Sequence, residues 1–254
     1  MILVNRRAGS GLRLRSKNYI QSLLTWLCAL AALAVTRALP AAAAEEGVAL
    51  AIVYDTSGSM RETVKDKDGK PAAKYVIANN ALASITRQIQ AFTTNSVTGE
   101  ARRIDAGVFI FNSPGARAAV PFGKFDPLAI EQWVRGFDFP AGGTPLGNAL
   151  NAAAQAVLRS PLSRKHVLVI TDGISNIGPA PATVMAQLKQ QVERNHEQLS
   201  VHFVAFDVNA KVFEPVKKMG ATVVEALDAK QLDAQLSFIL QKKILLEEEE
   251  PAKK

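Results

Sequence analysis

Short, fully apolar runs alternate along this chain with longer stretches in which apolar residues recur at helical spacing. The run 48–54 reads Val-Ala-Leu-Ala-Ile-Val-Tyr, which is too short for an amphipathic helix and is typical of a strand buried on both faces. Pro121 restricts the run 118–122 to a short edge strand. Further apolar runs predict strands at 106–111, 166–171, 200–206 and 221–225.

Helices are predicted between these strands. Asp126 followed by proline is a typical helix start, and Thr144 is expected to cap the helix that Pro145 opens. A final helix carries Leu232, Leu236, Ile239 and Leu240 on one side. The other helical segments are 72–92, 126–134, 145–158, 181–194 and a short stretch at 212–219.

This alternation predicts an α/β fold. We expect a doubly wound, mostly parallel six-stranded sheet with helices on both faces and one short antiparallel edge strand. The predicted domain spans residues 45–245, and residues 246–254 form a charged tail.

The first 44 residues have a different character from the rest of the chain. Basic residues precede an apolar run at 20–35, and the small residues Ala41 to Ala44 follow it. This order is typical of a secretory signal peptide that is cleaved before Glu45. An uncleaved anchor in the inner membrane, formed by residues 20–35, is the alternative. Both interpretations place the domain outside the cytoplasm, in the periplasm or the extracellular space.

The net charge of +7 does not indicate a nucleic-acid partner. Residues 1–44 hold six basic residues and no acidic one, which leaves 24 basic and 23 acidic residues in the remainder. A nucleic-acid-binding domain would carry a basic face within its fold. The only cysteine, Cys28, lies in the apolar run, so residues 45–254 offer neither an internal disulfide nor a thiolate metal site.

Oxygen-bearing side chains follow the predicted strands at their carboxyl ends, which is where an open parallel sheet forms its ligand site. Alternate residues of an extended segment point the same way, so side chains spaced by two can converge. Hydroxyls and carboxylates without histidine or cysteine favour a hard cation, most naturally Mg²⁺, with Mn²⁺ or Ca²⁺ as alternatives. The candidate ligands are Asp55, Ser57 and Ser59 after the first strand, Asp172 after the fourth, and Thr144 before a helix.

Three segments in order resemble the von Willebrand factor A domain: Asp55-Thr56-Ser57-Gly58-Ser59, Gly143-Thr144-Pro145-Leu146 and Thr171-Asp172-Gly173. The resemblance covers roughly residues 46–245 and implies a metal-ion-dependent adhesion site. By that resemblance the hydroxyls of Ser57, Ser59 and Thr144 ligate the metal, and Asp55 and Asp172 act directly or through water. An Asp or Glu of a partner protein would fill the open position, next to Gly58, Gly143 and Gly173.

Two other functions remain open from the residues alone. A metal-assisted hydrolase could use the same ion, but no Gly-x-Ser-x-Gly elbow and no phosphate-binding loop occurs, and each histidine is expected to be a surface or packed residue. The same motifs could also be turns and helix caps in a module that binds no metal. We therefore expect a binding protein and not an enzyme, with membrane contact only if the N-terminal segment stays attached.

Two further expectations concern local structure. Trp133 is expected in the core or beside the metal loop, and residues 65–70 in a mobile surface loop.

Overall fold

The computed structural model describes residues 44–94, 102–112 and 115–246. Residues 1–43, which hold nearly all of the predicted signal peptide and the whole alternative anchor, and residues 247–254 of the charged tail lie outside the described residues. The helices are α2 (Lys74–Thr94), α3 (Pro127–Gly136), α4 (Leu146–Leu158), α5 (Pro181–Asn195), α6 (Glu214–Lys218) and α7 (Ala229–Ile239), with short helical turns η1 (Gly58–Arg61), η2 (Ala210–Phe213) and η3 (Leu240–Leu245).

Six strands form one sheet in the order β5-β4-β1-β6-β7-β8. They are β1 (Glu45–Tyr54), β4 (Ile104–Asn112), β5 (Gly115–Lys124), β6 (Leu162–Thr171), β7 (Ser200–Phe206) and β8 (Thr222–Ala226). Only the edge strand β5 runs antiparallel to its neighbour, and the other pairs are parallel. The doubly wound, mostly parallel sheet is confirmed, although β5, with ten residues, is longer than predicted.

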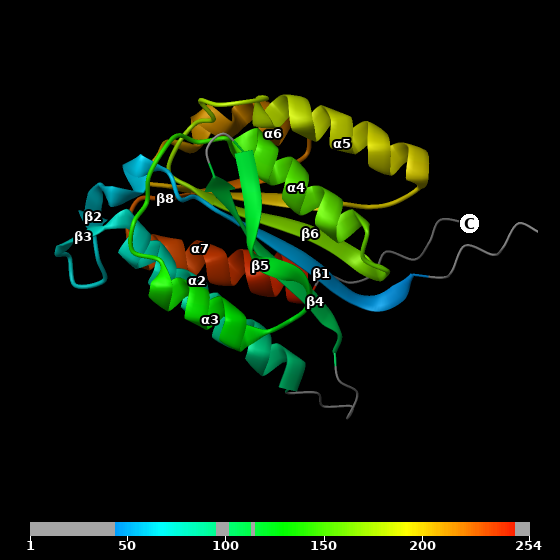
Figure 1. Ribbon diagram of the computed structural model, residues 1–254, viewed down its shortest axis with the longest axis horizontal. Helices are drawn as coiled ribbons and strands as arrows, with labels where there is room; N and C mark the ends of the chain where they lie inside the picture. The colour runs from blue at the N-terminus through cyan, green and yellow to red at the C-terminus, as the bar shows by residue number, and fades with distance from the viewer. Residues whose placement is uncertain (1–43, 95–101, 113–114, 247–254) are drawn as a thin grey trace, which may run out of the picture. The chain divides into compact units, whose positions relative to one another are not determined.

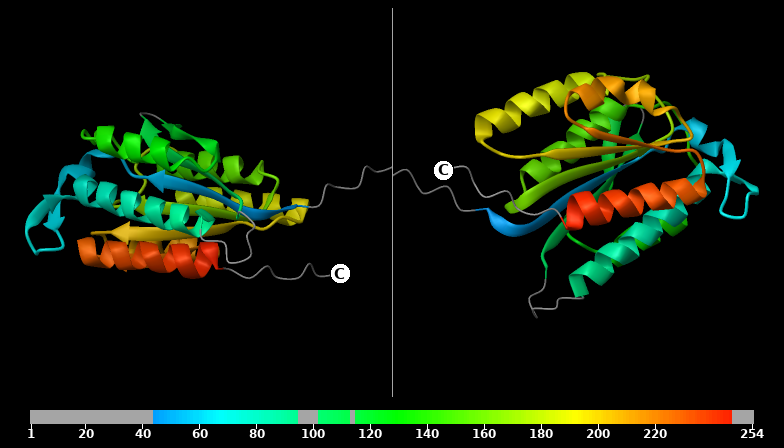
Figure 2. Two further views of the ribbon diagram at one scale, coloured as in Figure 1. Left: turned by 90° about the horizontal axis from the view of Figure 1, so that it is seen from below. Right: turned by 180° about the vertical axis from the view of Figure 1, so that it is seen from behind.

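Helices cover both faces of this sheet. In Figure 1, α4, α5 and α6 lie above the strands and α2, α3 and α7 lie below them. Figure 2 shows α2 and α7 side by side in the view from behind. Each face has its own apolar core, because alternate residues of β1 point to opposite sides: Leu50 and Ile52 belong to one core, Ala51 and Val53 to the other.

The chain order reverses at β1, since β4 pairs on one side of it and β6 on the other. A crevice outside the carboxyl ends of the strands is the usual ligand site at such a point. Asp55 follows β1 directly and Asp172 follows β6, so the fold brings these two residues to the same edge.

The expected surface loop at 65–70 is largely confirmed, because residues 66–70 form the exposed turn between two short strands that were not predicted. These strands, β2 (Thr63–Lys65) and β3 (Pro71–Ala73), form an antiparallel hairpin, which projects from one end of the molecule in both Figure 1 and Figure 2. One local expectation was wrong. Thr144 does not cap α4. The helix begins one residue later than predicted, which leaves Pro145 at the cap position without a side-chain cap. The cap predicted at Asp126 is confirmed, as its carboxylate accepts from the backbone of Ala129.

Among the described residues, no helix combines the length and the apolar character needed to cross a membrane.

Candidate metal-binding site

Four of the five predicted ligands are joined by hydrogen bonds. The backbone N–H of Ser57 donates to Asp55 Oδ1 at 2.8 Å. Ser57 Oγ and Ser59 Oγ lie 3.0 Å apart, and Ser59 Oγ donates to Asp172 Oδ1 at 2.8 Å. The turn η1, which begins at Gly58, holds the two serine hydroxyls together. Two carboxylates and two hydroxyls from two separate strand ends therefore converge.

Asp55 is the most deeply buried member of this group. It has no exposed surface, and its Oδ2 accepts a 2.6 Å hydrogen bond from Thr171 Oγ1. Burial, followed by the negative charge of Asp172, raises the pKa of Asp55 to about 6. Two neighbouring carboxylates that repel one another would be stabilised by a cation between them.

Thr144 lies on the loop that flanks the serine turn. Backbone bonds join the two loops, because Gly58 N donates to Gly142 O at 3.0 Å and Ala141 N donates to Thr56 O at 2.9 Å. The backbone N–H of Thr144 donates to Asn176 Oδ1 at 2.7 Å. Thr144 is thereby fixed and buried, 5% exposed, between the loop after β1 and the segment after β6.

Gly58, Gly143 and Gly173, which were predicted to lie where the partner binds, differ in their surroundings. A Cβ on Gly143 would lie 2.6 Å from Ile177 Cδ1 and 2.8 Å from Asn176 Oδ1, so a side chain here would force these two side chains to move. A Cβ on Gly173 would meet no atom within 4 Å, and one on Gly58 would meet Gly142 O at 3.5 Å, an ordinary contact. Their role towards a partner stays a prediction.

The donor chemistry fits a hard divalent cation. Within the described ranges, no group of three or more His, Cys, Asp or Glu residues could hold a metal. The candidate site therefore depends on hydroxyl oxygens as well as on Asp55 and Asp172, which is the chemistry that Mg²⁺ accepts and that Zn²⁺ and Cu²⁺ sites rarely use.

A lysine that the sequence did not single out lies next to this group. Lys74, at the start of α2, is 3% exposed, and its Nζ lies 3.1 Å from Asp172 Oδ2, 2.8 Å from Glu62 Oε2 and 3.0 Å from Asp207 Oδ2. Burial alone would lower the pKa of Lys74, but these hydrogen bonds and the charge of Asp172 raise it above its usual value.

Lys74, Glu62 and Asp207 were not predicted from the sequence, and a sequence signal existed only for Asp207. Asp207 follows β7 directly, and the rule that ligand sites form beyond the carboxyl ends of strands could have found it. Lys74 and Glu62 carry no such signal, because their proximity depends on the β2–β3 hairpin, whose short strands have no recognisable periodicity.

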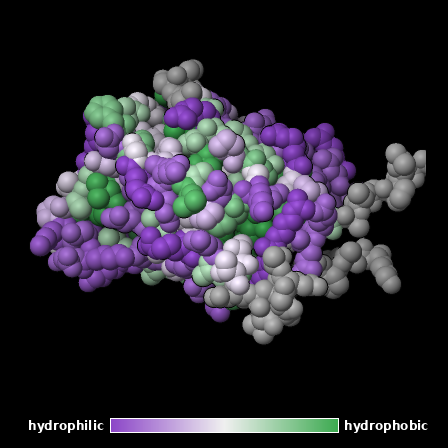
Figure 3. Space-filling model, turned by 60° about the horizontal axis from the view of Figure 1, so that its bottom comes forward, coloured by the Kyte–Doolittle hydropathy of each residue, from purple (hydrophilic) through white to green (hydrophobic). Residues whose placement is uncertain are grey.

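Exposed apolar side chains flank the site. Phe139 and Ile174 are 69% and 60% exposed; the first precedes the Thr144 loop and the second follows Gly173. The guanidinium of Arg61 lies 5.5 Å from the centroid of the Phe139 ring. By contrast, hydrophilic residues dominate the helix face that Figure 3 brings forward, with hydrophobic ones scattered among them.

Aromatic packing supports the base of the site. Tyr54, the residue before Asp55, meets the ring of Trp133 edge to face at 5.2 Å, and Trp133 stacks on Phe137 at 5.3 Å. The Tyr54 hydroxyl donates to Asn79 Oδ1 at 2.7 Å. The expectation that Trp133 packs against the core is confirmed.

Two of the three histidines are packed, as expected. His166 and His202 are buried on neighbouring strands, with their rings stacked at 5.7 Å. Burial first, and then the charges of His202 and Arg164, lowers the pKa of His166 to about 3. Burial followed by the charge of Lys243 lowers the pKa of His202 to about 4. Both histidines precede the strand ends at which the candidate ligands lie.

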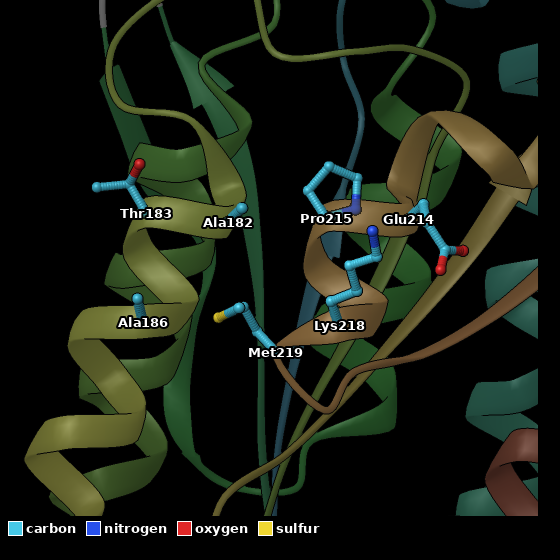
Figure 4. Close-up of a pocket in the computed structure, with 7 residues that line it drawn as sticks. All are labelled: Ala182, Thr183, Ala186, Glu214, Pro215, Lys218 and Met219. Carbon is cyan, nitrogen blue, oxygen red and sulfur yellow. The ribbon is translucent and has the colours of Figure 1, made fainter.

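A separate groove of about 600 Å³ lies between α5 and α6. Figure 4 shows the side chain of Met219 extending towards α5, opposite Ala182 and Ala186. None of the residues lining this groove is a candidate metal ligand, so the groove is distinct from the site at the strand ends.

Comparison with known proteins gives a family match to part of the chain, and a fold. Residues 50–175, which include all five candidate ligands, match the family model of the von Willebrand factor type A domain. No curated protein matches the chain in sequence. Solved structures match with low identity, which supports the fold alone.

The PilB minor pilin from Streptococcus sanguinis is similar with a TM-score of 0.59 and 14% identity over 78% of this chain and 62% of the pilin. The chain therefore spans less than two thirds of the pilin's length. The vWF domain of the type V pili tip protein Mfa5 from Porphyromonas gingivalis has a TM-score of 0.55 and 12% identity, with 78% of this chain and 96% of that domain covered.

Proximal thread matrix protein 1 from the mussel byssus has a TM-score of 0.54 and 18% identity, with 77% of this chain and 48% of that protein covered. Its structure has a zinc-occupied MIDAS motif.

Proposed function

Since residues 50–175 match the family model of the von Willebrand factor type A domain, we propose that the chain binds another protein through a divalent cation of the Mg²⁺ type. Asp55, Ser57, Ser59, Thr144 and Asp172 would hold the ion, and an Asp or Glu side chain of the partner would complete its coordination. The observation that carries the proposal is the hydrogen-bonded series from Asp55 through both serines to Asp172.

The distribution of charge supports an anionic partner group. Three of the five proposed ligands are neutral hydroxyls, so the ion would keep its attraction for an incoming carboxylate. Arg61 adds a positive charge beside Phe139. The exposed rings and methyl groups of Phe139 and Ile174 offer apolar surface of the kind that buried interface centres use.

We propose that this binding takes place outside the cytoplasm and without catalysis. The expected export signal supports the location, and the similarity to pilus and byssus proteins is consistent with it. Metal-assisted hydrolysis would require a general base beside the ion. The stacked histidine pair is buried on β6 and β7, upstream of the strand ends, so it does not favour that alternative.

Partner recovery with and without metal tests the proposal. The purified protein would be immobilised and exposed to envelope proteins of its native host, in Mg²⁺ and then in chelator. We expect a partner whose binding needs the ion and needs one acidic residue of its own. Equal recovery in chelator would exclude a metal-dependent interaction, and turnover of a phosphate ester that depends on Asp55 would favour the hydrolase.

A further inference from the structure

Lys74 is a buried positive charge beside the candidate ligand group. The site contains three carboxylates around its Nζ, which come from the connection after η1, from the end of β6 and from the end of β7. A buried ammonium is tolerated only when it is paired and hydrogen-bonded. The three contacts fix Lys74 in place, so its charge is a permanent part of the site.

Asp172 divides its two oxygens between the ligand group and this lysine. Its Oδ1 accepts from Ser59 Oγ at 2.8 Å, and its Oδ2 accepts from Lys74 Nζ at 3.1 Å. Oδ1 of Asp172 therefore faces the serine hydroxyls, and the ammonium group of Lys74 balances part of the negative charge of Asp172.

We propose that Lys74 weakens metal binding in the free domain, so that the partner's carboxylate is needed to hold the ion firmly. The proposal rests on the proposed function, because it concerns the same ion. The ammonium of Lys74 and an ion held by Asp172 would share one carboxylate, and like charges so placed repel one another at the effective dielectric of a protein. A partner carboxylate would supply the negative charge that Lys74 offsets, and ion and partner would then bind cooperatively.

A purely structural role for Lys74 predicts the opposite effect on the metal. If the lysine only braces the ends of β6 and β7, its removal would loosen Asp172 and weaken the binding of the ion. If its charge opposes the ion, removal should tighten that binding. The sign of the change therefore separates the two roles.

Titration calorimetry with Mg²⁺, on the exported form of the whole chain, measures this sign. Lys74→Met removes the charge at similar length, Lys74→Gln removes it and keeps an N–H donor, and Lys74→Arg retains it. We expect about tenfold tighter Mg²⁺ binding in the two neutral variants, at one ion per chain. Lys74→Arg should stay within about threefold of wild type.

The outcomes are decisive in both directions. Unchanged or weaker binding in Lys74→Met and Lys74→Gln overturns the proposal, and so does a second bound ion. If neither neutral variant folds, Glu62→Gln serves in their place. Its exposed carboxylate is one of the three around the ammonium, so its loss should weaken Mg²⁺ binding, and unchanged or tighter binding overturns the proposal.

An Asp55→Ala control separates this inference from the proposed function. If wild type and Asp55→Ala bind Mg²⁺ equally, the metal site itself is wrong. If binding requires Asp55 but the neutral Lys74 variants bind no more tightly, only the role of Lys74 is wrong.

Discussion

Ser59 Oγ donates a 2.8 Å hydrogen bond to Asp172 Oδ1 across 113 residues of sequence. This bond directly links the side chains of the turn after β1 and of the segment after β6. These two strands are neighbours in the sheet at the point where the strand order reverses. The same two oxygens are proposed to face one ion. The fold thus brings these two oxygens together from distant parts of the sequence.

Removal of the Thr144 hydroxyl should weaken the metal and partner complex without unfolding the domain. Thr144→Val keeps the shape of the buried side chain and deletes the oxygen, so we expect Mg²⁺ affinity to fall by roughly tenfold or more. Thr144→Ser keeps the hydroxyl and is the matched control. Calorimetry of both variants tests this, and equal affinities for valine and serine would remove Thr144 from the ligand set.

Gly143→Ala should destabilise the domain, because its Cβ would come within 2.6 Å of Ile177 Cδ1 and 2.8 Å of Asn176 Oδ1. We expect a loss of about 1 kcal/mol in the free energy of unfolding, because the half-buried Ile177 and the exposed Asn176 side chains must move aside. Gly173→Ala places its methyl group in open space and should stay within about 0.5 kcal/mol of wild type. Urea unfolding in chelator measures both, and similar values for the two variants would contradict this packing.

Acid should destabilise the domain through the buried histidine pair. The folded-state pKa values of about 3 for His166 and about 4 for His202 lie below the ordinary value of 6.5. Below pH 6.5 the unfolded chain therefore binds protons that the folded domain does not. The contribution of each histidine to stability is full above pH 6.5 and falls towards pH 4, by about 1.4 kcal/mol per pH unit. Asp55, whose pKa is raised to about 6, contributes in the opposite direction below pH 6, so the net fall is smaller than the sum for the two histidines.

His202→Leu tests this pH dependence. The variant removes one of the two histidines. Between about pH 6 and pH 4.5 its free energy of unfolding should therefore fall less steeply than that of wild type, with a slope smaller by about 1.4 kcal/mol per pH unit. Urea unfolding in chelator at several pH values gives the slope directly. An unchanged slope would mean that His202 is not neutral in the folded domain.

We expect the mature protein to begin near Glu45. Cleavage after Ala44 would make Glu45, the first residue of β1, the new N-terminus, with its nitrogen 2.9 Å from Pro161 O. Intact mass spectrometry of protein recovered from the native host measures the start point. A chain that retains residues 1–44 in the membrane fraction would support the anchor.

Features that depend on local sequence could be predicted, namely most strands and the group of candidate ligands. The strand predicted at 200–206 coincides with β7, since a short, mostly apolar segment has few alternatives in an α/β protein. The order of three oxygen-rich segments led to the hydrogen-bonded group of Asp55, Ser57, Ser59 and Asp172.

Residues whose role depends on tertiary contacts could not be placed in this way. Lys74 begins an alanine-rich helix like any surface lysine, and only the folded chain brings Glu62, Asp172 and Asp207 around it. Thr144 has the composition of a helix cap, yet its loop is held by Asn176 and by bonds to the turn after β1. Those tertiary bonds decide its conformation in place of the local capping preference.

Mg²⁺ calorimetry on wild type, Asp55→Ala and Asp68→Ala addresses the metal site most directly. Asp68 is an exposed carboxylate in the β2–β3 hairpin, so its variant controls for nonspecific attraction of the cation. We expect one Mg²⁺ per chain in wild type and Asp68→Ala, with a matching rise in melting temperature, and neither effect in Asp55→Ala. Equal binding by all three proteins would show that Asp55, Ser57, Ser59, Thr144 and Asp172 do not form a metal site.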